Sequence, residues 1–183
     1  MNTNRLSQTI EEILNKQVQK EAQAAQIYLS YGIWADSKGY SGISNLLFRH
    51  SGEERNHMMK VIEYIQKRGG KAKVTGLQSP PPDPANLQDC FEKILQHEID
   101  NSKAIYAIVE MAFEEKDWAT WNFGQWFVKE QIEEETLAMD LLDKVKVAGG
   151  KNVSNDSLLY LDTKIGQKED EAELARDVSV DNP

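Results

Sequence analysis

Four glutamates interrupt the helical pattern of apolar residues in this sequence. Glu21, Glu54, Glu98 and Glu134 each stand near the middle of a stripe in which apolar side chains recur at steps of three and four residues. A carboxylate in a protein core is costly unless it is paired with a cation or binds a metal. No Lys or Arg lies near these glutamates on the same stripes, so the pattern predicts converging carboxylates that need metal cations.

The second stripe adds an imidazole to these carboxylates. Glu54-Arg-Asn-His57 places two ligand types at i and i+3, on one face of a helix. Oxygen-rich sites with one imidazole suit Fe(II), Mn(II) or, less well, Zn(II). A zinc hydrolase would normally carry His-Glu-x-x-His, and His97-Glu98 begins that motif, but Asn101 does not complete it. The sequence therefore favours the carboxylate-bridged di-iron pattern of helical bundles.

Four long helices are needed to bring these residues together. The stripes cover residues 10–35, 47–65, 91–112 and 123–145, and glycines at 39–42, 69–70 and 149–150 mark helix ends. Four of the five prolines fall between residues 80 and 84, which indicates one break between two pairs of helices. The first and third connections are short and predict antiparallel neighbours. The middle connection, about 17 residues at about 3.3 Å each, can run the whole length of the bundle and leave helices two and three parallel.

A short amphipathic segment at 157–165 follows the fourth helix. It is too short to be stable alone, so its apolar face needs the bundle or another subunit. The predicted fold class is all-α: a four-helix bundle with a long crossover between helices two and three and a short fifth helix, spanning residues 1–166. The remaining residues, 167–183, carry six acids and two basic residues and are expected to form a disordered acidic tail.

The amino-acid composition limits the classes of binding partner and the cellular compartment of the protein. The net charge of −9 disfavours nucleic acid and anionic membrane surfaces as partners. The single cysteine, Cys90, excludes an internal disulfide, a cysteine-based zinc site and an iron–sulfur cluster. The N-terminal segment is polar, and no apolar run approaches the roughly 20 residues of a membrane span. We therefore expect a cytoplasmic protein.

Several segments together resemble bacterial non-haem ferritin, a ferritin-like di-iron carboxylate family. They are residues 21–28 (EAQAAQIY), 49–58 (RHSGEERNHM), 96–98 (QHE) and 125–135 (QWFVKEQIEEE), in matching order and spacing over about residues 4–166. The resemblance implies an iron storage protein with ferroxidase activity. Such a protein would oxidise Fe(II) with O₂ or H₂O₂ and store ferric mineral inside a homo-oligomeric cage of 24 subunits.

The resemblance also implies roles for individual residues. Glu21, Glu54 and His57 would bind one iron. Glu54, as a bridge, would bind the second iron with Glu98 and Glu134. Close to these irons would lie Gln131, the family tyrosine Tyr28 and the family tryptophan Trp126. A third iron site, as in bacterial members, would be formed by Glu53, Glu130, Glu133 and Glu134. His50, one turn before Glu54, is a further candidate beside the site.

Two departures from related families limit what is carried over. Arg55 occupies the position of the haem-ligating Met of bacterioferritin, and the fourth helix reads Gln131-Ile-Glu-Glu134 where bacterioferritin has a second Glu-x-x-His, so we expect no haem. Animal ferritins place acids in their three-fold pores near what are here Trp121 and Gly124; neither residue is acidic, so the resemblance does not carry over an iron entry route.

Two other functions remain open at this point. A rubrerythrin-like di-iron oxidase or peroxidase without storage would share the bundle, but a single cysteine cannot supply the rubredoxin module that those proteins usually carry. A purely structural helical bundle would bind no metal. Particle mass and metal content distinguish the three hypotheses.

Overall fold

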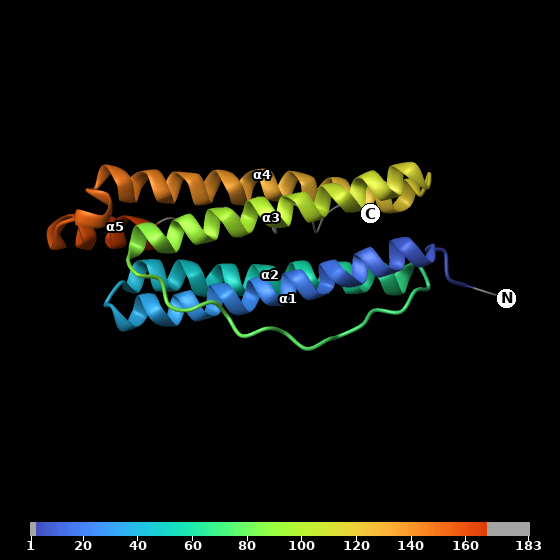
Figure 1. Cartoon of the computed structure of the whole chain (residues 1–183), viewed down its shortest axis with the longest axis horizontal. Coiled ribbons are helices and arrows are strands. Elements are labelled where there is room, and N and C mark those ends of the chain that lie inside the picture. Colours follow the sequence, from blue (N-terminus) through green and yellow to red (C-terminus); the bar gives the residue numbers. More distant parts are fainter. Residues whose placement is uncertain (1–2, 168–183) are drawn as a thin grey trace, which may run out of the picture.

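Four long helices lie alongside one another in the computed structural model, which describes residues 3–167 (Figure 1). They are α1 (Gln8–Ser37), α2 (Ser41–Lys67), α3 (Leu87–Glu114) and α4 (Trp118–Val147). A 3-10 turn (Gly150–Asn152) and the short helix α5 (Asn155–Gly166) follow. The described residues contain no strand, so the predicted fold class is confirmed. The predicted acidic tail lies outside the described residues from position 168 onward.

Polar caps set where most of these helices begin. The side chains of Ser7, Asn86, Asp117 and Ser154 each accept a hydrogen bond from a backbone N–H in the first turn of the helix that follows. Asp117 is the N-cap of α4, which explains why this helix begins at Trp118, five residues before the first apolar residue of the predicted stripe. Apolar periodicity identifies the buried face of a helix, whereas the cap identifies its first residue.

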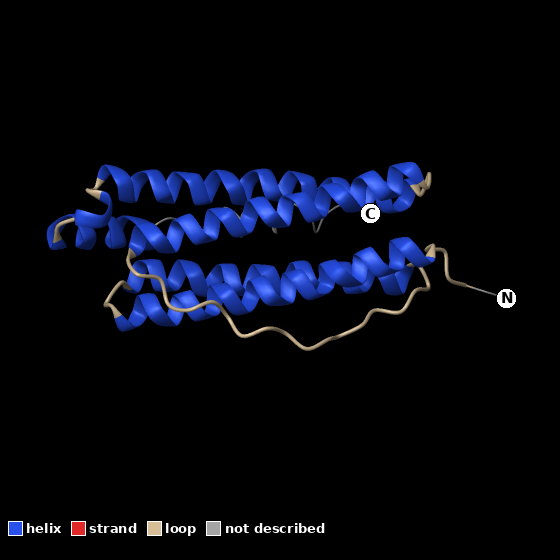
Figure 2. Cartoon of the chain, viewed as in Figure 1, coloured by secondary structure: helices blue, strands red, loops and turns tan. Residues whose placement is uncertain are grey.

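The connection between α2 and α3 runs along α1 for the length of the bundle (Figure 2). Three amide side chains of α1 bind its backbone: Asn15 Oδ1 accepts from the N–H of Lys73 at 2.7 Å, Gln19 donates to the carbonyl of Gly76 at 3.1 Å, and Gln23 Oε1 accepts from the N–H of Gln78 at 2.9 Å. This arrangement confirms the predicted crossover. It makes α2 and α3 parallel and leaves two antiparallel hairpins, α1–α2 and α3–α4.

Helix α5 packs against the start of α2. Its Leu161 and Ile165 are buried, and the Asp162 carboxylate accepts hydrogen bonds from the backbone N–H groups of Gly42 and Ile43 at 3.1 and 2.9 Å. A Cβ at position 42 would lie 2.1 Å from the Asp162 carbonyl oxygen, so only glycine fits there. The predicted amphipathic segment therefore covers the bundle with one face. Leu159 and Tyr160 lie on its exposed side.

Two apolar clusters fill the two ends of the bundle. The α5-end cluster includes Tyr31, Phe91 and Leu161, and the far-end cluster includes Ile10 and Ile105. Between them lies a layer of buried polar side chains, which we call the polar layer. Its members are Gln17, Glu21, His50, Glu54, His57, Glu98, Asn101, Ser102, Gln131 and Glu134. Among the described helices, none has an apolar stretch long enough to span a membrane.

Candidate metal centre

The four glutamates that interrupt the apolar stripes meet in the polar layer, one from each long helix. Glu21, Glu54 and Glu98 are 0–1 % exposed, and Glu134 is 8 % exposed. Their predicted positions on the core-facing side are therefore correct. Because the ends of the bundle are apolar, these carboxylates have only one another and the neighbouring polar side chains as partners.

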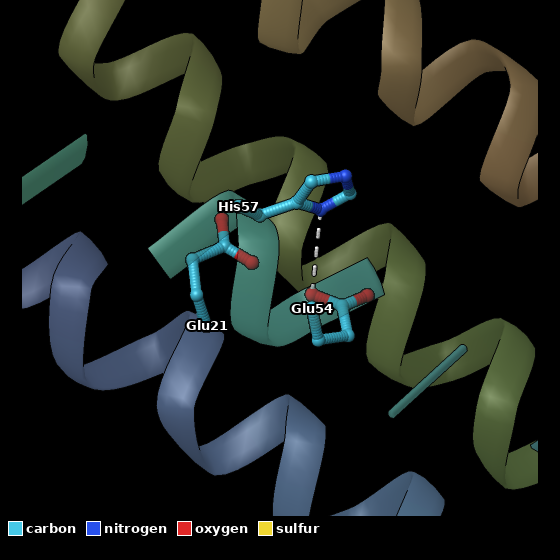
Figure 3. A group of neighbouring side chains, drawn as sticks. All are labelled: Glu21, Glu54 and His57. Atoms are coloured by element: carbon cyan, nitrogen blue, oxygen red, sulfur yellow. Dashed lines mark ion pairs between the residues drawn. The ribbon is translucent and has the colours of Figure 1, made fainter. Parts of the chain in front are cut away.

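Glu21, Glu54 and His57 form the first candidate group (Figure 3). One ligand atom from each residue lies within 4.8 Å of the others, and Glu54 Oε2 is 3.6 Å from His57 Nδ1. Glu21 Oε2 and Glu54 Oε2 are buried and have no hydrogen-bond partner. An unpartnered carboxylate oxygen in a protein interior is costly. Two of them beside an imidazole are a donor set that a divalent cation would satisfy.

Glu98 and Glu134 lie on the facing helices α3 and α4. The Tyr28 hydroxyl donates to Glu98 Oε1 at 2.6 Å, and the Gln131 amide donates to Glu98 Oε2 at 3.3 Å. Glu134 Oε2 is 3.5 Å from His50 Nδ1. Both oxygens of Glu98 are therefore occupied, in contrast to the free Oε2 of Glu21.

His50 contributes more to the centre than its place in the sequence suggested. It forms a second candidate group with Glu53 and Glu134, in which one ligand atom from each lies within 4.8 Å of the others. His50 Nδ1 is 3.2 Å from Glu53 Oε2, and its ring stacks on Tyr28 with the centroids 5.4 Å apart. Its position on the second stripe, one turn before Glu54, was the available signal.

The residues predicted for the third iron site are distributed over three surroundings. Glu53 joins His50, Glu130 Oε1 lies 3.7 Å from His57 Nε2, and Glu133 pairs with Lys129 at 3.5 Å. The Glu133 side chain is 62 % exposed, because it points about 100° around α4 from its neighbour in the polar layer. A third site formed by these glutamates stays a prediction.

Trp126 covers the imidazole side of the first group. Its ring meets the His57 ring edge to face, with the centroids 5.4 Å apart, and Lys60 Nζ lies 4.0 Å from the Trp126 ring centroid. Trp126 is 37 % exposed. The predicted placement of Trp126 near the centre thus agrees with the structure.

Similarity to known proteins identifies the family of this chain. The family model of the ferritin-like domain matches residues 11–148, which is most of the chain. The chain belongs to the ferritin family. Family membership supports iron storage with ferroxidase activity as its function, as the sequence resemblance predicted.

Individual ferritins match this family member over most of their length. A bacterial non-heme ferritin of Campylobacter jejuni is 37 % identical over 144 residues, covering 79 % of this chain and 86 % of the relative. A bacterial non-heme ferritin of Bacteroides fragilis is 34 % identical over 163 residues, covering 89 % and 99 %. The open pore ferritin of Archaeoglobus fulgidus superposes with a TM-score of 0.86 at 36 % identity, covering 92 % of this chain and all of that one.

Burial raises the pKa values of two carboxyl groups in this ferritin-family centre. Burial, together with the charge of Glu21, raises the pKa of Glu54 well above its ordinary value. Burial, together with the charge of Glu134, raises the pKa of Glu98 to about 7. Without a bound cation, these carboxyl groups would therefore hold protons near neutral pH. A cation that binds here must displace them.

The two imidazoles respond to their carboxylate neighbours. Burial alone would lower the pKa of His57, but the carboxylates of Glu130 and Glu54, 3.7 and 3.6 Å from its ring nitrogens, prevail and raise it to about 11. His50 likewise has its pKa raised, because Glu134 outweighs the effect of burial. Burial would raise the pKa of Glu134, but its contact with His50 prevails and lowers it. Without a bound cation, protonated imidazoles would thus supply positive charge beside the carboxylates.

Proposed function

We propose that the protein oxidises Fe(II) at two adjacent positions in the polar layer and stores the ferric product. Glu21, Glu54 and His57 would bind one Fe(II), and Glu54, Glu98 and Glu134 the other, with Glu54 shared between them. One observation carries this proposal: four buried carboxylates, one from each helix, converge and leave two oxygens without partners. Carboxylate oxygen with a single imidazole is a ligand set that suits Fe(II).

The proposed reaction is an electron transfer from iron to an oxidant. Two Fe(II) ions each lose one electron, and O₂ takes up both electrons with two protons to give H₂O₂; with H₂O₂ as the oxidant, two electrons and two protons give two water molecules. Holding both ions in one carboxylate cluster brings two one-electron donors to one oxidant molecule. Tyr28 and Gln131 would orient Glu98 through the hydrogen bonds described above.

The two positions differ in their ligands, and this difference suits a protein that releases its product. The proposed ligands of the first position include the His57 imidazole, whereas those of the second are carboxylates and, at most, the Gln131 amide; His50 lies 3.5 Å from Glu134 at that side. We therefore expect the second position to hold iron more weakly, which would let oxidised iron leave for a mineral store. Glu53, Glu130 and Glu133 would bind iron beside the pair.

A cage of 24 copies of this chain is the proposed store. Apolar side chains remain exposed on the outer faces of the helices, including Ile33 on α1 and Leu159 and Tyr160 on α5, each at least 59 % exposed. Exposed apolar surface of this kind is typical of subunit interfaces. Size-exclusion chromatography of the purified protein would give a particle of about 500 kDa for the 20.8 kDa chain. A dimer would instead support an oxidase without storage.

Aerobic addition of Fe(II) to the metal-free protein tests the proposed activity. The absorbance of the ferric product should grow much faster than in buffer of the same pH. The iron should then elute with the particle on a sizing column. A rate equal to that in buffer would refute ferroxidase activity, and ferric iron that precipitates outside the particle would refute storage.

A further inference from the structure

Three buried amide and hydroxyl residues in the polar layer have no part in the ligand sets proposed above. Gln17 on α1, Asn101 on α3 and Ser102 on α3 are 1–3 % exposed. Buried amides must be hydrogen-bonded to be tolerated. Here their partners are one another, the candidate metal ligands and Glu135, which accepts a hydrogen bond from Ser102 Oγ.

The amides form a continuous chain across three helices. Gln17 Nε2 donates to Glu21 Oε1 at 2.6 Å and to Asn101 Oδ1 at 2.8 Å. Asn101 Nδ2 donates to Gln131 Oε1 at 3.1 Å. Gln131 Nε2 then faces Glu98 Oε2 at 3.3 Å and Ser102 Oγ at 3.4 Å. We call Gln17, Asn101 and Gln131 the amide relay.

The amide relay has a direction that its own hydrogen bonds fix. An amide offers one carbonyl oxygen and one NH₂ group, and an ionised carboxylate only accepts. The carbonyl oxygens of Asn101 and Gln131 are both occupied by N–H donors of the relay. Reversing Asn101 would set NH₂ against NH₂ on one side and carbonyl against carbonyl on the other. The relay therefore presents N–H donors to Glu21 at one end and to Glu98 at the other.

We propose that Gln17 and Asn101 are positioning residues of the iron-oxidising centre, an inference that rests on the function proposed above. Gln17 holds Glu21 by Oε1 and leaves Oε2, which has no partner, free for a cation. Asn101 holds the carbonyl of Gln131, so Gln131 acts as a donor to Glu98 and its oxygen is withheld from the metal. Asn101 thus acts on both metal positions through its neighbours.

Co(II) binding to the full-length, metal-free protein tests the amide relay without iron oxidation. Asn101→Leu keeps the approximate volume and removes both hydrogen bonds. We expect Co(II) to bind about 10- to 100-fold more weakly, as is usual when a residue that orients metal ligands is lost. The visible spectrum of bound Co(II) should also change, because Glu21 and Gln131 are free to reorient. Gln17→Met, which removes the α1 end alone, should weaken binding at the first position.

Asn15→Leu is a matched control for the loss of a buried amide. Asn15 is 9 % exposed and makes three hydrogen bonds, to the carbonyls of Glu11 and Lys71 and from the N–H of Lys73. This variant should melt at a lower temperature and bind Co(II) like the parent. A merely structural role of Asn101 would give the same result as Asn15.

Two outcomes would overturn the inference. One is parent affinity and an unchanged Co(II) spectrum in Asn101→Leu. If that variant does not fold, Gln17→Met decides, and parent-like binding in it would be the second. The proposed function fails separately: a parent protein that binds Co(II) but oxidises Fe(II) no faster than buffer loses the ferroxidase role while the relay still positions a cation site.

Discussion

The ends of the helical bundle and its middle follow opposite rules of packing. At both ends, hydrocarbon side chains such as Phe91 and Ile10 fill the core and need no partner other than one another. In the middle, carboxylates, amides and two imidazoles occupy the same inward-facing positions of the same helices. The ends therefore stabilise the fold, whereas the polar layer opposes it until cations bind. The same helical period therefore places side chains that raise the stability of the fold at the ends and side chains that lower it in the middle.

The largest effect should come from removing the shared ligand of the polar layer. Glu54→Ala takes one carboxylate from both proposed iron positions, so we expect the rapid phase of Fe(II) oxidation to slow by about 100-fold or more. Stopped-flow absorbance of the ferric product measures it. Glu63→Ala is the control on the same helix, because Glu63 is 58 % exposed and pairs only with Lys67 in the described structure. A parent rate in Glu54→Ala would show that this residue is not the bridge.

Truncation at an apolar end should produce the opposite pattern. Leu14 is 1 % exposed in the far-end cluster, and Leu14→Ala should cost about 2–5 kcal/mol of stability. The melting temperature should fall by roughly 5–15 °C, with Co(II) affinity as in the parent. Val147→Ala, at a side chain 90 % exposed, is the control for stability. If Leu14→Ala instead weakens Co(II) binding as strongly as it lowers stability, the two regions are not separate in function.

The polar layer should make stability depend on pH and metal together. The pKa of Glu98 is raised to about 7 by burial and by Glu134, so the folded metal-free protein keeps a proton that the unfolded chain releases at lower pH. Its free energy of unfolding should therefore fall as the pH rises from about 5 through 7. Zn(II) competes with that proton, so the rise in melting temperature on adding Zn(II) should be larger at about pH 8 than at about pH 6.

Glu98→Gln is the control for this linkage. Glutamine keeps the shape of the side chain and carries no titratable proton, so the metal-free variant should lose part of the pH dependence of its melting temperature. Scanning calorimetry of both proteins, with and without Zn(II), gives the comparison. Equal stabilisation by Zn(II) at both pH values would contradict a proton-holding centre.

The smallest effects should come from the edge of the polar layer. Glu130 lies 3.7 Å from His57, whereas Glu133 is exposed and pairs with Lys129. The double substitution Glu130→Ala with Glu133→Ala should leave the first rapid oxidation phase intact and change the iron-to-oxygen ratio or the rate of later turnovers. Glu133→Ala alone should change less than Glu130→Ala. Loss of the first phase in the double variant would place these residues in the catalytic pair.

Periodicity predicted the four helices and the buried glutamates, and the length of the middle connection predicted the crossover. The helical stripes identify inward positions, and Glu21 and Glu98 stand on them in place of apolar residues. The length of the middle connection left few alternatives to a crossover along the bundle. These features depend only on the spacing of residues along the chain, which can be read from the sequence.

Hydrogen-bond partners in the polar layer were not predictable in the same way. Gln17 and Ser102 occupy inward-facing positions of the helical period. Periodicity does not determine which rotamer an amide adopts or which helix its partner comes from. Asn101 lies in the third segment, one residue before Ser102, and the sequence offered it only as a position where a zinc ligand is missing. For Glu133, by contrast, the exposed position follows from the helical period. Its neighbour Glu134 is buried, and a one-residue step on a helix turns the side chain about 100° away.

Because the crossover along α1 joins two hairpins, cation binding at the centre can report when the hairpins dock during folding. The hairpins are α1–α2 and α3–α4, and each contributes two of the four buried glutamates. Neither hairpin alone contains both proposed metal positions. A cation that needs ligands from both hairpins binds only after they have docked, so it should favour the docked state by mass action. Cation binding at the second position, which takes Glu54 from one hairpin and Glu98 and Glu134 from the other, would therefore time the docking of the two halves.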